Sequence, residues 1–180
     1  GNLTLNAGAT GITQTGDILI GTGTADLTGG AITLTAANVL GAVTVQAGTG
    51  NVSLTENDAI SVAALTHVGT LALNAGANAI TQTGAISVGT GATDLTGGAI
   101  TLTAANVLGA VTVQAGTGNV SLTENDVISI ASYTHTGNLT LNAGANDIGQ
   151  TIPFELGTGT LTLTGSNITL ADANNTFGAL

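Results

Sequence analysis

Short runs in which apolar and polar residues alternate recur along the whole chain, and glycine or asparagine flanks most of them. Leu3-Thr4-Leu5, Ile32-Thr33-Leu34 and Val52-Ser53-Leu54 show the pattern. A period of two with β-branched residues and turn-forming neighbours is typical of short β-strands. Helical periodicity extends over no more than one turn, and 28 glycines interrupt the chain. The pattern therefore predicts an all-β protein.

A long internal repeat organises these runs. The segment 26–58 returns letter for letter at 94–126, so the chain has a 68-residue period. The period divides the chain into repeats 3–70 and 71–138 and a partial repeat, 139–180. We expect a single repeat-built segment over residues 1–180, excised from a longer protein because the chain opens in mid-pattern.

The runs that follow a Gly-x pair or a similar turn return at short intervals. Their starting positions differ by 29, then by 20, then by 19, and the series repeats. These intervals are too short for a propeller blade and lack the helix of a leucine-rich or ankyrin unit. We therefore predict a right-handed parallel β-helix (β-solenoid), with about three coils per repeat and seven to eight coils in total. The runs begin at Leu3, Ile32, Val52, Leu71, Ile100, Val120, Leu139 and Ile168.

The longer intervals contain a GTGTADLTGG-type segment, which we expect to bulge out as a loop or an extra short strand. Stacking of the coils would bury the aliphatic residues in one column and turn the residues between them outward. Asn6, Asn74 and Asn142, in the recurring LNAG, are expected to be turn residues, with a stacked asparagine ladder as the alternative. The predicted outward ladder, rich in hydroxyl groups, comprises Thr4, Thr33, Ser53, Thr101, Ser121, Thr140 and Thr169.

The composition argues against several classes of function. The chain has no Lys or Arg and a net charge of −10, so it lacks the cations that bind nucleic acid or an anionic membrane surface. It has no cysteine, and no apolar run approaches the ~20 residues of a membrane helix, so we expect no membrane insertion. With so few titrating groups, we expect the stability to be insensitive to pH and salt.

The sequence offers few candidates for chemistry. Glu56 and Asp58, with their equivalents Glu124 and Asp126, are weak Ca²⁺ candidates because a good site needs six or more oxygen ligands. We expect them to be solvated turn residues, and we predict no catalytic residue, metal or cofactor.

The two histidines, His67 and His135, are repeat equivalents in different coils, so they cannot share a metal ion. We expect each to be a hydrogen-bonded surface or loop residue.

Three stretches, GNLTLNAG, GGAITLTAANVLGAVTVQAGTGNVSL and NITLADANNTFGAL, resemble the repeat regions of filamentous-haemagglutinin-like and autotransporter-passenger-like giant secreted bacterial adhesins. The resemblance covers the whole chain and lies in its Gly-x-[LIV]-[TS]-[LIV] strands. It implies a non-enzymatic stalk or fibre, secreted or at the bacterial cell surface, that serves cell adhesion. The expected partners are neighbouring repeats of the same polypeptide, with end-to-end self-association and a receptor that the sequence does not name.

Two alternatives stay open. Outward Thr and Ser ladders on a β-solenoid could order water, which would make the chain an ice- or surface-binding protein. A polysaccharide-active β-helix enzyme is the other alternative, but it needs clustered carboxylates and usually a Lys or Arg.

Overall fold

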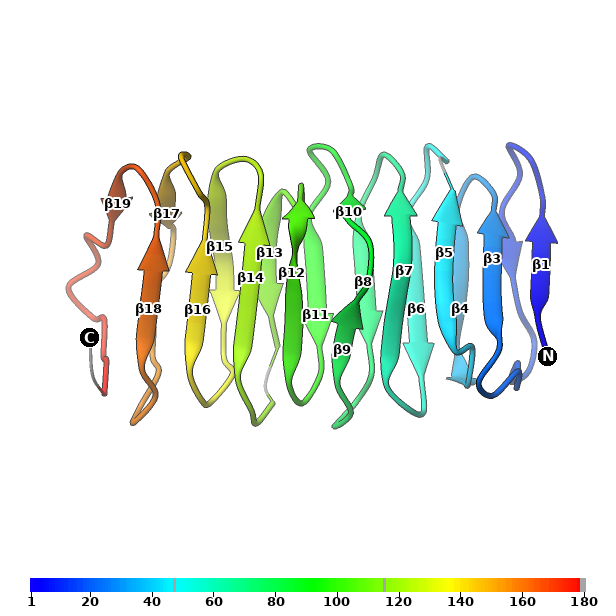
Figure 1. The fold of residues 1–180 in the computed structure, drawn as a ribbon, viewed down its shortest axis with the longest axis horizontal. Helices are drawn as coiled ribbons and strands as arrows, with labels where there is room; N and C mark the ends of the chain where they lie inside the picture. The colour runs from blue at the N-terminus through cyan, green and yellow to red at the C-terminus, as the bar shows by residue number, and fades with distance from the viewer. Residues whose placement is uncertain (47, 115, 179–180) are drawn as a thin grey trace.

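The computed structural model describes residues 1–46, 48–114 and 116–178, and it consists of two parallel β-sheets that run side by side along one axis (Figure 1). Sheet A contains β1 (Leu3–Asn6), β3 (Thr24–Thr28), β5 (Ala42–Gln46), β7 (Ile60–Thr66), β9 (Ile80–Gln82), β12 (Ile100–Asn106), β14 (Val120–Glu124), β16 (Leu139–Asn142) and β18 (Leu161–Thr164), with the short β10 (Ile86–Ser87) paired to β7. Sheet B contains β2 (Ile12–Thr13), β4 (Ile32–Asn38), β6 (Val52–Glu56), β8 (Leu71–Asn74), β11 (Thr93–Thr96), β13 (Ala110–Val113), β15 (Ile128–Tyr133), β17 (Ile148–Gln150) and β19 (Ile168–Thr169).

Each coil contributes one strand to each sheet and pairs with the coils before and after it. Leu3 pairs with Ala25 and Ala25 with Val43, so each of these pairings marks one full turn of the chain around the axis. In Figure 1 the strands of sheet A rise in front, those of sheet B descend behind, and the chain advances from N to C, which is a right-handed winding. The predicted right-handed β-solenoid of about eight coils is confirmed.

The 68-residue repeat spans three and a half coils rather than about three. Its first copy supplies seven strands, β1 to β7, so the next copy begins in the opposite sheet. Leu3 lies in sheet A, whereas its equivalent Leu71 lies in sheet B. The expected single aliphatic column is therefore wrong for Leu3, which does not stack with Ile32, although Ile32, Val52 and Leu71 do stack.

The odd half coil comes from the GTGTADLTGG segment. We expected it to bulge as a loop or an extra strand, and the strand alternative is the correct one. Its residues form β3, which lies between β1 and β5 and buries Ala25 and Leu27 completely. The segment is therefore a regular strand of sheet A, in which Ala25 and Leu27 face inward while Asp26 between them does not.

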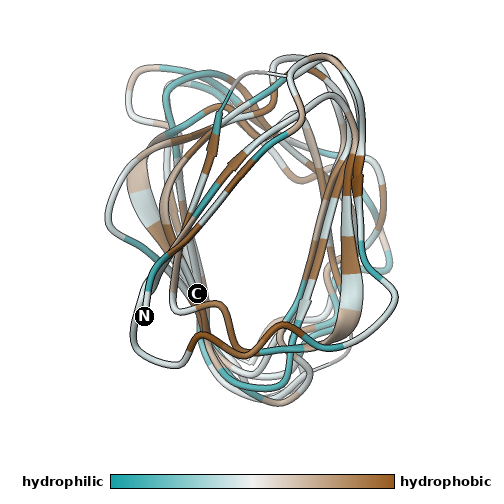
Figure 2. Ribbon diagram, turned by 90° about the vertical axis from the view of Figure 1, so that its right-hand side faces the viewer, coloured by the Kyte–Doolittle hydropathy of each residue, from teal (hydrophilic) through white to brown (hydrophobic). Residues whose placement is uncertain are grey.

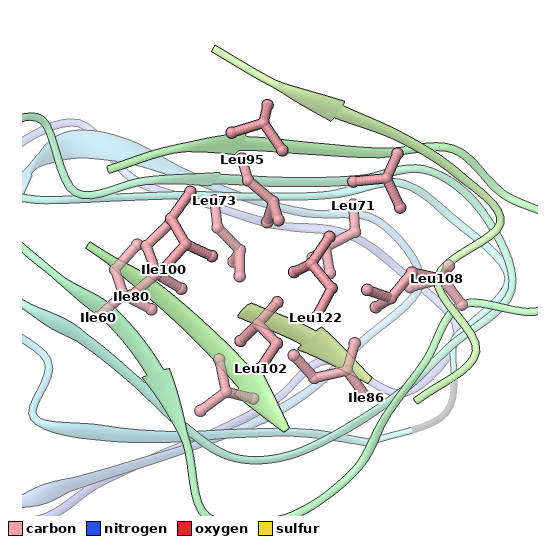
Figure 3. Close-up of a cluster of buried hydrophobic side chains, with 14 of the residues drawn as sticks. Ile60, Leu71, Leu73, Ile80, Ile86, Leu95, Ile100, Leu102, Leu108 and Leu122 are labelled. Atoms are coloured by element: carbon pink, nitrogen blue, oxygen red, sulfur yellow. The ribbon is translucent and has the colours of Figure 1, made fainter. Parts of the chain in front are cut away.

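Inside, the alternation of apolar and polar residues works as predicted. Figure 2 looks along the axis and shows successive coils superposed into one tube. Each inward side chain that is fully buried contributes ~1.5–3 kcal/mol, and all those of the middle coils are buried. Figure 3 shows side chains of the two sheets pointing toward one another across the interior, among them Leu71, Leu73 and Leu95 from sheet B and Ile100, Leu102 and Leu122 from sheet A.

The corners between sheets are built from asparagine and glycine. The Asn6 side chain accepts a hydrogen bond from the Gly8 N–H at 3.0 Å, and Gly8 has a φ of 57°. The same turn recurs at Asn74 and Asn142, which confirms that the LNAG asparagines are turn residues. At other corners the coils touch backbone to backbone, so a Cβ on Gly48 would overlap the Gly29 carbonyl oxygen.

Candidate functional site

The predicted outward ladder does not form one column. Because successive repeats begin in opposite sheets, its members are divided between the two faces of the rod. Thr4, Thr101, Ser121 and Thr140 lie on sheet A, whereas Thr33, Ser53 and Thr169 lie on sheet B.

Sheet A carries the longer run of hydroxyl groups. Six residues from six consecutive coils are direct strand partners, so their side chains stack at the ~4.8 Å spacing of neighbouring strands. We call this run the sheet A hydroxyl column. Beside it, Thr123, Asn142 and Thr164 form the start of a second polar column. The sheet A hydroxyl column consists of Ser61, Thr81, Thr101, Ser121, Thr140 and Thr162.

The equivalent column on sheet B is broken. It begins with Thr13, Thr33 and Ser53, continues through Ala72 and Asp94, and returns to a hydroxyl only afterwards. A methyl group and a carboxylate thus interrupt the hydroxyl groups. The two faces of the rod are therefore built from the same repeats but differ in chemistry.

Two repeat-equivalent grooves lie where three coils meet at a corner, and their volumes are about 310 and 410 Å³. Backbone and small side chains line both of them, without a titratable group among the lining residues. They are Gly8, Ala9, Thr28, Gly30, Gly48 and Thr49 in the first groove and Gly76, Ala77, Thr96, Gly98, Gly116 and Thr117 in the second.

Both histidines are hydrogen-bonded loop residues, as one of the two alternatives predicted, but they are buried, so the surface alternative is wrong. His67 is 2% exposed, and its Nε2 lies 3.1 Å from the Thr70 carbonyl oxygen. His135 is fully buried, and its Nε2 lies 2.6 Å from the Gly98 carbonyl oxygen. Burial lowers the pKa of His67. The alternation continues inward past Leu65 to His67, and it places both rings in the corner rather than outside.

The two acidic turns also differ from the expectation of solvated residues. Glu56 and Glu124, at the ends of β6 and β14, are each only 3% exposed. The Glu56 Oε2 accepts a hydrogen bond from the Leu40 N–H at 2.9 Å, and Glu124 accepts an equivalent one from Leu108. This bond holds each glutamate side chain inside the coil. A glutamate side chain that pointed outward would leave the Leu N–H without this acceptor.

Each buried glutamate lies beside an aspartate two residues later. Glu56 Oε1 and Asp58 Oδ1 are both buried and have no hydrogen-bond partner within the part of the chain that the structure describes, and the second turn is the same. Burial raises the pKa of Glu56 to about 7 and that of Glu124 to about 8, and the neighbouring aspartate adds to each shift. We call Glu56 with Asp58 the first acid pair, and Glu124 with Asp126 the second.

An amide network supports the first acid pair. Asn38, fully buried, donates from Nδ2 to the carbonyl oxygens of Leu34 and Thr55, and exchanges hydrogen bonds with the Gln14 side chain. The pairs Asn106–Gln82 and Asn175–Gln150 repeat the exchange. Sequence reasoning missed these residues, although a glutamine returns at the same place in every repeat.

No metal centre is evident in residues 1–46, 48–114 and 116–178: they contain no group of three or more His, Cys, Asp or Glu side chains placed to hold an ion. Each acid pair offers two carboxylates, and the pairs lie three and a half coils apart, ~17 Å along the axis. The described residues also contain no helix long and apolar enough to cross a membrane.

Comparison with known proteins identifies a family without assigning a function. A family model described as repeats of unknown function (DUF5649) matches residues 1–46, 49–115 and 117–180. Its second and third matches begin at positions 49 and 117, one full internal repeat apart. No curated protein and no solved structure matches the chain. The chain therefore belongs to the DUF5649 family of repeats.

Proposed function

We propose that the chain is a non-catalytic stalk or fibre segment of a large bacterial adhesin, secreted or held at the cell surface. The observation that carries the proposal is the unbroken parallel pairing from β1 to β18 in sheet A and from β2 to β19 in sheet B. Nearly identical repeats are added along this ladder, so the length grows while the cross-section stays the same.

The same pairing supplies the stiffness. Every inner coil is hydrogen-bonded to both neighbours along two walls, and the aliphatic columns between the walls exclude water. The chain does this without disulfides and without Lys or Arg. Bending the rod would require strand pairs in one sheet to separate while the core between the sheets opens. Many hydrogen bonds and apolar contacts would have to break together, so the rod resists bending.

The resemblance to giant secreted adhesins supports the location and the adhesive role. A rod of this kind holds a terminal binding module away from the cell and contributes distance rather than recognition. Its interactions with neighbouring repeats of the same chain are those that the coil-to-coil pairing provides.

The length of the rod tests the proposal. Versions with two, three and four 68-residue repeats should increase in maximum dimension by ~17 Å per repeat in small-angle X-ray scattering, because each repeat adds three and a half coils. Surface labelling of intact cells that produce the parent protein tests the location. A maximum dimension that does not rise linearly with repeat number would contradict the stalk.

One observation favours a second candidate, an ice- or surface-binding protein. The sheet A hydroxyl column presents six hydroxyl groups at a regular spacing without a charged residue among them. Thermal hysteresis of the chain, compared with variants Thr101→Tyr on sheet A and Thr33→Tyr on sheet B, distinguishes the candidates. Hysteresis that only Thr101→Tyr removes would favour this candidate, and hysteresis equal to that of buffer would eliminate it.

A further inference from the structure

The two carboxyl groups of each acid pair lie in surroundings that disfavour the ionisation of both. In each pair a glutamate oxygen and an aspartate oxygen are buried without a hydrogen-bond partner, and the neighbouring aspartate adds to the raised pKa of the glutamate. Two ionised carboxylates cannot satisfy each other by a hydrogen bond, because neither has a hydrogen to donate. Two negative charges in contact away from water also repel each other strongly. A proton or a cation shared by these oxygens would remove the repulsion.

A proton shared by the two carboxyl groups would remove the repulsion and give both unpartnered oxygens a hydrogen bond. If the glutamate carries it, Glu56 Oε1–H donates to Asp58 Oδ1, while Oε2 still accepts from the Leu40 N–H. One proton taken up from solvent then satisfies both unpartnered oxygens and removes one of the two charges. The pKa of each glutamate is raised in the direction that this requires.

A divalent cation fits less well. Ca²⁺ takes six to eight oxygen ligands, whereas each pair presents two unpartnered oxygens that are both shielded from solvent. The remaining glutamate oxygen is already occupied by a backbone N–H.

We propose that each Glu-Asn-Asp turn is a proton-binding device: a carboxyl–carboxylate pair that locks the corner when it shares a proton and loosens it when the proton is lost. The pair stabilises the backbone of the corner that follows β4. Glu56 ties β6 to Leu40, directly after the irregularity at which the β4–β6 register shifts between Leu34 and Asn38. The same arrangement recurs in the β12–β14 pair with Glu124.

Few other charges surround the acid pairs. The strands that flank the first pair, β4 and β8, have no titratable residue, and neither do β12 and β16 beside the second. Asp17 lies at the same edge as the first pair and accepts the Ala37 N–H, and the Asp147 backbone oxygen accepts the Ile128 N–H near the second. No cationic side chain of Lys or Arg exists to replace the proton.

The sign of the pH dependence follows from linkage. A carboxyl group whose pKa is higher in the folded state stabilises the fold fully below its unfolded value, and this contribution is lost as the pH rises through the folded value. The window is therefore about pH 4.5 to 7 for Glu56 and about pH 4.5 to 8 for Glu124. His67 acts in the opposite direction, since its lowered pKa removes stability as the pH falls. When variants are compared at the same pH, the contribution of His67 to stability is the same in each and cancels.

The decisive variant is Glu56→Gln with Glu124→Gln. Glutamine copies the protonated glutamate, because its oxygen accepts from the Leu N–H and its amide donates to the aspartate. We expect the melting temperature to equal that of the wild type at pH 5 and to exceed it by roughly 5 °C or more at pH 8.5. Asp26→Asn with Asp94→Asn is the matched control, because it removes the same charge from two repeat-equivalent sites outside the pairs. The control should keep the wild-type slope between pH 5 and 8.5.

A second measurement does not depend on any variant folding. The chain contains three glutamates, Glu56, Glu124 and the exposed Glu155, so ¹³C-glutamate labelling gives three carboxyl resonances and an internal reference. The resonances of Glu56 and Glu124 should titrate well above the usual range of a glutamate. Titration of all three together would overturn the proposal, as would a glutamine variant that gains nothing at pH 8.5. A wild-type melting temperature at pH 7 that falls on adding EDTA would show that a cation, not a proton, occupies the pairs.

Discussion

The strands β4 and β12 have the same sequence, ITLTAAN, and the same burial pattern, yet they lie in opposite sheets. Both pair with a VSLTE strand on one side. On the other side the pairing is also equivalent, since Thr33 meets Thr13 and Thr101 meets Thr81. The comparison separates two levels of information. Local sequence decides which side chains point inward, whereas the number of half coils before a strand decides which face of the rod it occupies.

The largest expected effect tests whether the two copies are energetically equal. Leu34 and Leu102 are repeat equivalents and fully buried, in sheets B and A. Leu34→Ala and Leu102→Ala should each lower the free energy of unfolding by about 2–5 kcal/mol, because each leaves a cavity in the aliphatic column. Urea unfolding of the two variants should give losses within about 1 kcal/mol of each other. Unequal losses would mean that the copies do not share one environment.

A slightly smaller effect is expected at the amide network. Asn38→Ala and Asn106→Ala leave backbone carbonyl oxygens of the corner unpaired, and each unsatisfied buried group costs about 1–3 kcal/mol. Thermal unfolding followed by circular dichroism measures the loss. Gln14→Ala is the control, since it removes the partner amide but leaves the Asn38 bonds to Leu34 and Thr55 in place, and it should cost less.

The acid pairs offer a sharper comparison between copies. The pKa of Glu124 is raised to about 8 and that of Glu56 to about 7. Glu124→Gln alone should therefore stabilise the chain at pH 8.5 more than Glu56→Gln alone, by up to about 1 kcal/mol. Chemical denaturation at pH 5 and pH 8.5 gives the difference. Equal gains would show that the two corners bind their protons alike.

The smallest effect concerns the outer faces. Ala72→Thr with Asp94→Thr would make the sheet B column as continuous as the sheet A hydroxyl column, and exposed substitutions of this kind change stability by no more than about 0.5 kcal/mol. If sheet A binds ice, the variant should show greater thermal hysteresis than the wild type, since it then presents two binding faces. Unchanged hysteresis in a folded variant would limit any such role to sheet A.

End-to-end association is a further expectation for the isolated chain. Leu5 and Ile12 in the first coil border an open hollow of about 330 Å³, and Ile168 in the last coil is 44% exposed. Unpaired strand edges at both ends favour stacking of one copy on another. Sedimentation over a range of concentrations should show species longer than the monomer, and a strict monomer at high concentration would contradict this.

Much of the fold could be predicted because its signal is local. Leu3-Thr4-Leu5 and its relatives have a period of two that fixes strand and side, and the 68-residue period indicates a solenoid. The half coil was missed because β3 presents Ala25 at an inward position where stronger strands have Leu, Ile or Val, and Asp26 at an outward position where its partner strands have Thr. Its apolar signal is therefore faint, and only the pairing with β1 and β5 shows its place.

The candidate site was less predictable for a different reason. Charge in a turn usually indicates exposure, whereas the alternation along β6 continues from Val52 and Leu54 to Glu56 and places the glutamate on the inward side. The expected insensitivity to pH followed from counting titratable groups, but burial matters more than number. Burial raises the pKa of two glutamates, and these two groups are enough to make the stability depend on pH.

The odd number of half coils also governs orientation at a distance. Adding one repeat moves whatever follows the rod ~17 Å further out and turns it by half a revolution about the long axis. Adding two repeats restores the original heading at twice the displacement. Duplication or loss of a single repeat in such a gene would thus reverse the direction in which a distal module faces. An odd or even number of repeats therefore sets the direction of the module, while the total number sets its distance.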